Sequence, residues 1–180
     1  MYYVYHSDGV CNETDSVFIK VNNELPTASF STINNCHGDT VQFSASSGLL
    51  TSNVSWEWSF GSSIQNPSQE LTLGTNNIQL ITVNLDNNCS DTLVQQVEIY
   101  LSPVADFSAT EVCFGDEVVF TDNSSINTVS WEYDLADGIG NSTNQSPTYI
   151  YTSPGLFNVT LTVISDNGCK DNSTIDVIVN

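Results

Sequence analysis

Residues 156–166 read LFNVTLTVISD, and this stretch decides the fold class. Its apolar side chains occupy every second position, at Phe157, Val159, Leu161 and Val163. A period of two predicts a β-strand with one buried face and one solvated face. The next residues, Asn167 and Gly168, are a turn signal, and Cys169 follows them.

This pattern occurs twice in the chain. LITVNLDNNC at 80–89 matches TLTVISDNGC at 160–169, and CHGDTVQF at 36–43 matches CFGDEVVF at 113–120. Matches of this length indicate an internal repeat, with an early and a late cysteine in each unit.

The repeat predicts two whole units and part of a third. The first unit spans residues 26–101 and the second spans 102–180, while residues 1–25 match only the end of a unit and would form its C-terminal strands. We therefore expect the chain to be a window on a longer tandem array. Ser, Thr and Asn are abundant, and Val, Ile, Phe and Tyr alternate with polar residues, which predicts an all-β fold.

The charge of the chain is strongly one-sided. There are 21 acidic residues and two basic ones, for a net charge of -19 at pH 7. A chain without a basic stripe cannot displace counterions from phosphate, which argues against nucleic acid and anionic membranes as partners. No segment approaches the ~20 apolar residues of a membrane span. A solvated acidic surface is the plain alternative to a specific cation partner.

The five cysteines suggest a disulfide framework. The simplest pairing is within units, joining Cys36 to Cys89 and Cys113 to Cys169, while Cys11 aligns with the late cysteines and would have its partner outside this chain. Such bridges imply an oxidising compartment, and reduced buried thiols are the alternative. In a sandwich both cysteines of a unit can lie at one end, so we expect the bridge to clamp that end against extension and proteolysis.

Unit two carries a family resemblance. WEYDLADG at 131–138, followed by SPTYIYTSPGLFNVTLTV at 146–163, resembles the polycystic-kidney-disease (PKD) domain. That family has an aromatic-Asp-Phe-Gly-Asp-Gly strand and turn, then Tyr, Gly and an alternating strand. Unit one keeps the residues Trp58, Phe60 and Gly61 but has serines where the pattern has Asp, Asp and Gly, at Ser59, Ser62 and Ser63. The resemblance implies tandem, seven-stranded, immunoglobulin-like β-sandwiches.

The cysteine-bearing form of this domain is similar to repeats in giant surface proteins of the Bacteroidota, such as gliding adhesins and type IX-secreted proteins. This resemblance implies a cell-surface location, with neighbouring repeats, other copies in a filament, and surface glycans or proteins as partners. Ser16, Thr40 and Thr92 each follow Asp and precede an aliphatic residue. They resemble the O-glycosylation acceptor of that phylum and are candidate modification sites.

Catalytic constellations are missing from the sequence. A nucleophile–base pair would need His6 or His37, and the sister unit has Phe114 in place of His37. Nucleophile-elbow, P-loop and dinucleotide motifs are not found. Glu132 and Asp134 alternate onto a solvent face, where desolvation cannot make them general acids. We expect a non-enzyme without a cofactor.

Calcium is the metal that the sequence could bind. Asp134, Asp137 and Asn141 fall in DLADGIGN, a predicted turn with flexible glycines, and calcium prefers hard oxygen ligands of this kind. Alternatively, Asp137 and Gly138 form a turn and Asp134 is a solvated strand residue.

Three tryptophans, Trp56, Trp58 and Trp131, could bind sugar if they were exposed. Their alternation with other apolar residues indicates core positions instead.

The sequence leaves three functions open. The first is a structural or adhesive repeat of a surface stalk or filament. The second is an accessory module that holds substrate for a secreted protease or glycoside hydrolase. The third is a calcium-tuned adhesion repeat.

Overall fold

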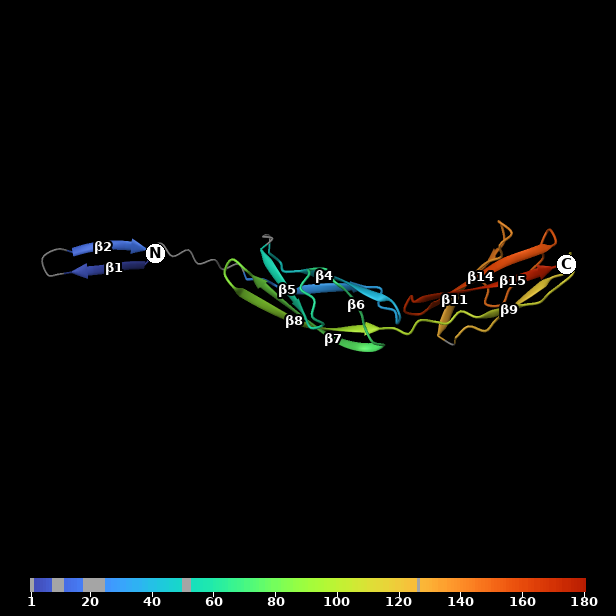
Figure 1. The fold of residues 1–180 in the computed structure, drawn as a ribbon, viewed down its shortest axis with the longest axis horizontal. Coiled ribbons are helices and arrows are strands. Elements are labelled where there is room, and N and C mark those ends of the chain that lie inside the picture. The colour runs from blue at the N-terminus through green and yellow to red at the C-terminus, as the bar shows by residue number, and fades with distance from the viewer. Residues whose placement is uncertain (1, 8–11, 18–24, 50–52, 126) are drawn as a thin grey trace. The chain divides into compact units, whose positions relative to one another are not determined.

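The structure, a computed structural model, describes residues 2–7, 12–17, 25–49, 53–125 and 127–180. All regular elements in these ranges are β-strands, which confirms the predicted fold class (Figure 1). Across the described ranges we find no helix with the length and apolar character of a membrane span.

The N-terminal element is a two-stranded hairpin. Strands β1 (Tyr2–Ser7) and β2 (Asn12–Val17) pair antiparallel, with Tyr2 opposite Val17. This hairpin lies within residues 1–25, where sequence predicts terminal strands of a unit. Cys11 and the side chains of His6 and Ser16 lie outside what the structure describes.

The first sandwich has two three-stranded sheets. One sheet has the order β3-β4-β6, formed by β3 (Ser29–Ile33), β4 (Thr40–Ser46) and β6 (Ser68–Glu70). The other has the order β5-β7-β8, formed by β5 (Val54–Trp58), β7 (Gly74–Asn84) and β8 (Cys89–Ile99). In β4 the residues Val41, Phe43 and Ala45 are buried and their neighbours are exposed. This alternation places one face of each sheet in the core.

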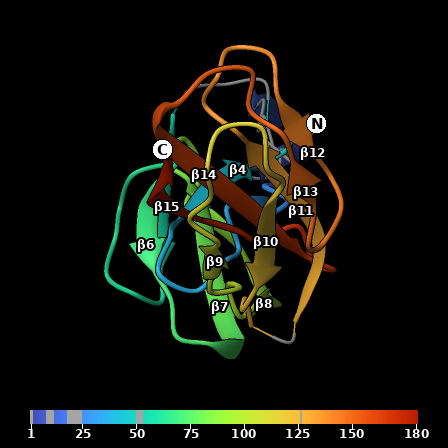
Figure 2. The ribbon, with the colours of Figure 1, turned by 90° about the vertical axis from the view of Figure 1, so that its right-hand side faces the viewer.

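The second sandwich repeats this plan with seven strands. One sheet has the order β13-β10-β9, formed by β13 (Thr148–Tyr149), β10 (Val118–Asp122) and β9 (Phe107–Ala109). The other has the order β12-β11-β14-β15, formed by β12 (Asn141–Ser142), β11 (Thr128–Asp134), β14 (Gly155–Ser165) and β15 (Lys170–Val179). Figure 2 shows β9 and β10 beside each other, as their antiparallel pairing requires.

The alternating stretch behaves in the core as predicted. Val159, Leu161 and Val163 are fully buried, and Phe157 is half-buried with its ring stacked on Tyr151 at a centroid distance of 3.9 Å. Stacked and edge-on aromatic pairs stabilise such cores beyond the area that they bury.

The three tryptophans, which the sequence predicts to be core residues, are buried to different degrees. Trp58 is buried and meets Phe30 edge-on, with ring centroids 5.2 Å apart. Trp56 and Trp131 are half-buried. Trp131 packs against the core of the second sandwich, and its ring N–H donates to Asp122 at 2.8 Å. A planar row of exposed tryptophans is therefore not formed by these three residues.

The early cysteine of each unit lies beside the end of the last strand. Cys36 forms a parallel bridge with Tyr100, the residue after β8, and Val112 forms the equivalent bridge with Val179 at the end of β15. The late cysteine lies where the last strand begins, because Cys89 is the first residue of β8 and Cys169 immediately precedes β15. Each sandwich therefore carries its two cysteines at opposite ends of one long strand.

This geometry corrects the predicted pairing. The disulfide of the described residues joins Cys36 to Cys169, with their Cα atoms 5.6 Å apart, and leaves Cys89 and Cys113 as free thiols. A bond between Cys36 and Cys89 would have to span β8, whose eleven residues extend over about 33 Å. Disulfides need Cα atoms within about 7 Å, so the prediction that the two cysteines of a unit lie at the same end is wrong.

Candidate functional site

The loop after β11 holds the residues that the sequence singles out for calcium. Ala136 has a left-handed φ of 62°, a conformation that is uncommon for a residue with a Cβ atom. The Asp134 carboxylate accepts a hydrogen bond from the Ala136 N–H at 3.0 Å. The loop closes where the Leu135 N–H donates to the Gly140 carbonyl at 3.0 Å. Asp134 thus stabilises the strained first residue of the turn.

Asp137 organises the second half of this loop. Its Oδ1 accepts hydrogen bonds from the main-chain N–H groups of Ile139 and Gly140, at 3.1 and 2.6 Å. Its Oδ2 accepts a hydrogen bond from the Tyr149 hydroxyl at 2.6 Å. The bond from Tyr149, followed by that from Gly140, holds the pKa of Asp137 below its ordinary value. The same bond raises the pKa of Tyr149.

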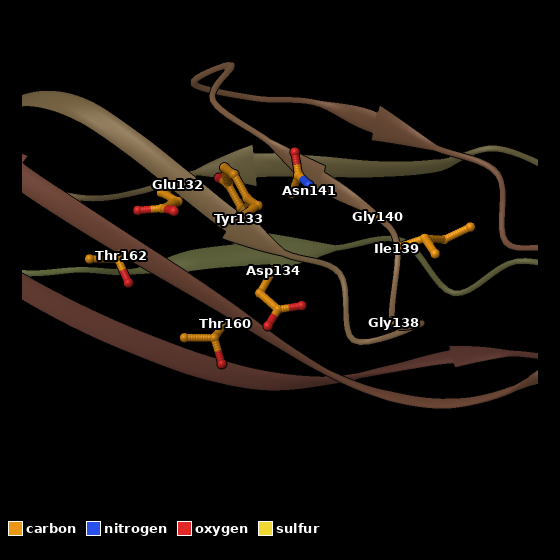
Figure 3. Close-up of a pocket in the computed structure, with 9 residues that line it drawn as sticks. All are labelled: Glu132, Tyr133, Asp134, Gly138, Ile139, Gly140, Asn141, Thr160 and Thr162. Carbon is orange, nitrogen blue, oxygen red and sulfur yellow. The ribbon is translucent and has the colours of Figure 1, made fainter.

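A hollow of about 560 Å³ lies next to this loop on the outer face of the sheet (Figure 3). Glu132 faces Thr162 across the strand pair, and Asp134 faces Thr160. The tip of the loop forms the rim, where Ile139 is 78% exposed. Tyr133 contributes its main chain, because its side chain is fully buried on the opposite face of β11. The hollow is therefore lined by carboxylates and hydroxyls and has one apolar residue at its edge.

Two of the three predicted calcium ligands line the hollow. Asp134 and Asn141 are register partners and both line the hollow. Asp137 does not line it, because its carboxylate is bonded to the loop and to Tyr149. Among the described residues no cluster of three His, Cys, Asp or Glu side chains could hold a metal ion. Asp137 thus has the turn role that was the alternative. Calcium binding by Asp134, Asp137 and Asn141 stays a prediction.

Two buried tyrosines fix the same region from the core side. The Tyr151 hydroxyl donates to the Leu135 carbonyl at 3.0 Å, and the Tyr133 hydroxyl donates to the Gln145 carbonyl at 3.0 Å. Burial raises the pKa of each hydroxyl to about 12, with a smaller contribution from a nearby Asp. These tyrosines therefore remain donors over the whole physiological pH range, which keeps the loop anchored.

Asp122 is a structural carboxylate that the sequence does not single out. Its carboxylate accepts hydrogen bonds from the Trp131 ring N–H, the Gln145 side chain and the Ser124 main-chain N–H. Burial by itself would raise the pKa of Asp122, but these bonds together outweigh burial and lower it. A lone Asp at the end of a predicted strand gives no sequence signal for this role.

Asp91 and Asp171 are a second missed pair, and the repeat contains a signal for them. Asp91 accepts a hydrogen bond from the Ala28 N–H at 2.8 Å, and Asp171 accepts one from the Ala105 N–H at 2.8 Å. Each Asp lies two residues after a late cysteine, so a duplicated Cys-x-Asp motif marks the contact. In each sandwich this carboxylate ties the segment before the first strand to the start of the last.

The remaining candidates lie apart from the hollow. Thr40 is exposed at the start of β4, and Thr92 is exposed in β8, so both hydroxyls are accessible to a modifying enzyme. Glycosylation of these residues stays a prediction. His37 is exposed, and its main chain holds the turn through hydrogen bonds with Tyr100 and Ser102.

Each whole unit is an antiparallel sandwich of two sheets, which defines an immunoglobulin-like β-sandwich. The PKD domain family matches residues 101–179. The PKD1 domain of the Vibrio cholerae metalloprotease PrtV is 34% identical, with 44% of this chain and 98% of that domain covered and a TM-score of 0.41. Residues 101–179 belong to the PKD domain family.

Two further solved structures are similar to the chain. The PKD1 domain of Vibrio anguillarum Epp is 28% identical over 44% of this chain and 94% of that domain, with a TM-score of 0.40. A chain from work on promiscuous carbohydrate-binding modules of the β-sandwich superfamily is 29% identical over 44% of this chain, with a TM-score of 0.41; the match covers 34% of that chain. A search of curated proteins finds no match.

Proposed function

We propose that the chain is a non-catalytic, extracellular structural or adhesion repeat, part of a long surface stalk or filament built from PKD domains. The observation that carries this proposal is the Cys36–Cys169 bond, which joins a cysteine of the first unit to a cysteine of the second. A bond of this kind persists in an oxidising compartment outside the cytosol. The bond cross-links successive units of a tandem array. Binding modules joined by flexible linkers would not need such a cross-link.

The bond also limits how far the chain can be extended. It spans a sequence separation of 133 residues, or about 450 Å of extended chain at about 3.4 Å per residue. In the chain-entropy treatment a loop of that length is worth on the order of 5 kcal/mol. The mechanical and protease-resisting role expected of the cysteines therefore stays part of the proposal, with the Cys36–Cys169 bond in place of the predicted pairs.

The proposal also covers the cellular location and the partners of the chain. The resemblance to gliding-adhesin-like, type IX-secreted proteins of the Bacteroidota supports a cell-surface site, with neighbouring repeats and other copies as partners. Surface glycans or proteins are further candidate ligands. The net charge of -19 argues against binding to nucleic acid and against insertion into a membrane.

Single-molecule pulling from both termini tests the structural role. With the disulfide intact, the residues between Cys36 and Cys169 should release none of their length, and reductant should add about 450 Å of contour length. The Cys36→Ser chain should behave like the reduced chain without any reductant. Equal contour lengths in oxidised and reduced wild-type chains would contradict the proposal.

A second candidate function is an accessory module that holds substrate for a secreted protease or glycoside hydrolase. It is favoured by the hollow lined by Glu132, Asp134 and two threonines, because carboxylates and hydroxyls are suitable partners for sugar hydroxyls. Calorimetric titration with soluble oligosaccharides tests it. Binding that is lost in Glu132→Gln but kept in Glu117→Gln, which lies away from the hollow, would support this function.

A further inference from the structure

Cys89 and Cys113 are free thiols in a chain whose other described cysteines are bonded. The repeat makes the two pairs equivalent, because Cys36 and Cys113 are the early cysteines of their units and Cys89 and Cys169 are the late ones. The bond in the structure joins an early cysteine to the late cysteine of the following unit. Each free thiol therefore has a bonded counterpart in the sister unit.

The turn that carries Cys113 matches the turn that carries Cys36. The Asp116 N–H donates to the Cys113 carbonyl at 3.0 Å, and the Asp39 N–H donates to the Cys36 carbonyl at 3.0 Å. The glycines of the two turns have nearly the same φ, 93° at Gly38 and 96° at Gly115. Cys113 is exposed on this turn, so its thiol can reach a partner.

The turns that carry the late cysteines also correspond. The residue before each cysteine has a left-handed φ, 57° at Asn88 and 80° at Gly168. The bonded Cys169 is 1% exposed, whereas Cys89 is half-buried. Cys89 thus lies on a scaffold like that of Cys169 without the partner that covers Cys169.

Neither free thiol can find this partner within its own sandwich. Cys113 lies beside the end of β15 and Cys169 lies before its start, so the strand separates them just as β8 separates Cys36 from Cys89. The partner of an early cysteine must come from a different repeat, as the Cys36–Cys169 bond demonstrates.

We infer that Cys113 forms a disulfide with the late cysteine of another repeat of this type, and that Cys89 receives the same bond from another early cysteine. The partner thiol is carried by a second copy of this chain or by a further repeat in the same polypeptide. In a pair of copies the bond joins Cys113 of one copy to Cys89 of the other and creates a directional, head-to-tail link. This inference goes beyond the proposed function, since a covalent link between repeats does not depend on what the repeats bind.

The bond forms by thiol–disulfide exchange with a small disulfide such as oxidised glutathione. The Cys113 thiolate attacks one glutathione sulfur, which forms a mixed disulfide and releases one reduced glutathione. The Cys89 thiolate of the partner repeat then attacks the Cys113 sulfur and releases the second glutathione. Two protein thiols are oxidised and one glutathione disulfide is reduced to two thiols.

Two full-length variants test the selectivity of this bond between separate copies. Both carry Cys11→Ser; one also carries Cys89→Ser and keeps Cys113, and the other carries Cys113→Ser and keeps Cys89. Mixed in a glutathione redox buffer, they should form the Cys113–Cys89 dimer in about tenfold excess over either symmetric dimer, measured by non-reducing electrophoresis and peptide mass spectrometry. Symmetric dimers in equal yield would overturn the inference, because they would show unselective oxidation of exposed thiols.

A fused chain distinguishes the two sources of the partner thiol. It contains residues 1–180, a copied Leu-Ser linker and residues 26–180, again with Cys11→Ser. A third and a fourth unit thus follow the second, with the third at its natural spacing. A Cys113–Cys89 bond in the fused chain alone assigns the partner to the same polypeptide, where the effective concentration is highest. If the bond forms both between the mixed variants and within the fused chain, either source can supply the partner thiol. Its absence from both arms, or rearrangement of Cys36 to pair with Cys89, overturns the inference.

Discussion

The Tyr149 hydroxyl donates a 2.6 Å hydrogen bond to the Asp137 carboxylate. Tyr149 ends β13 in one sheet of the second sandwich, and Asp137 lies in the loop that leaves β11 in the other sheet. The bond therefore joins the two layers at the edge of the sandwich. It also fixes the loop that forms the rim of the polar hollow.

Removing either partner of this bond should destabilise the second sandwich. We expect Asp137→Ala and Tyr149→Phe each to lower the free energy of unfolding by about 1–2 kcal/mol, because each leaves hydrogen-bonding groups without a partner. The double variant should cost less than the sum of the two, since both changes remove the same bond. Urea unfolding measures these values, with exposed Asp116→Ala as a control within about 0.5 kcal/mol of wild type.

Acid should remove the contribution of Asp137. The folded-state pKa of Asp137 lies below its ordinary value of 3.8, so the unfolded chain binds the proton more tightly. The stabilisation is thus present above pH 3.8 and is lost as the pH falls through the folded-state pKa. The difference in unfolding midpoint between wild type and Asp137→Asn should shrink over this range, and a constant difference would contradict the assignment.

Alkali should act through the buried tyrosines. Tyr133 and Tyr151 have a folded-state pKa of about 12, above the ordinary value of 10, so the folded chain binds these protons more tightly than the unfolded chain. Their contribution is complete below pH 10 and is lost as the pH rises towards 12. Tyrosinate absorbance should show these two groups ionising near pH 12 in the folded chain and near pH 10 after unfolding, and Tyr151→Phe should weaken the pH dependence of stability in this range.

Gly140 should not tolerate a side chain. A Cβ atom at this position would lie 2.8 Å from the Tyr149 ring and hydroxyl and 3.0 Å from the Asp137 carboxylate. We expect Gly140→Ala to destabilise the second sandwich by about 1–3 kcal/mol through overpacking, measured by urea unfolding. In a Tyr149→Ala background most of this penalty should disappear, because the clashing ring is gone. A penalty of the same size in both backgrounds would place the strain elsewhere.

The duplicated Cys-x-Asp motif offers a matched pair of variants. Asp91→Ala and Asp171→Ala each remove the 2.8 Å acceptor of one main-chain N–H, at Ala28 and Ala105 respectively. We expect each to cost about 1–3 kcal/mol and to act on its own sandwich. Hydrogen exchange should show faster exchange at Ala28 only in the first variant and at Ala105 only in the second. Exchange that accelerates at both positions in either variant would contradict this assignment.

Strand positions were predictable because apolar residues at every second position directly indicate which side chains of a strand are buried. Val159, Leu161 and Val163 are buried as the alternation predicts, and the prolines at 147 and 154 flank the short edge strand β13. The turn role of Asp137 was visible as one of two alternatives. Its bond to Tyr149 was not, because a contact between two sheets depends on how the layers pack, which local pattern does not record.

The cysteine pairing could not be predicted for a related reason. Sequence shows that Cys36 opens a turn and that Cys169 closes one, but not at which end of the sandwich each turn lies. The direction of the last strand decides this, because it carries the chain away from the late cysteine and back to the early one. The repeat is compatible both with a bond within a unit and with a bond between successive units, so it does not decide the pairing.

One long strand separates the early and the late cysteine of each unit, and this separation has a consequence for how the units evolve. A repeat with an internal disulfide could be exchanged by recombination without affecting its neighbour. Here Cys36 depends on Cys169 of the following unit, so replacing residues 102–180 by a domain without a late cysteine would leave Cys36 without its disulfide partner. A domain that replaces the second unit must therefore carry a late cysteine in the same place, so selection on one unit constrains the other through a single covalent bond.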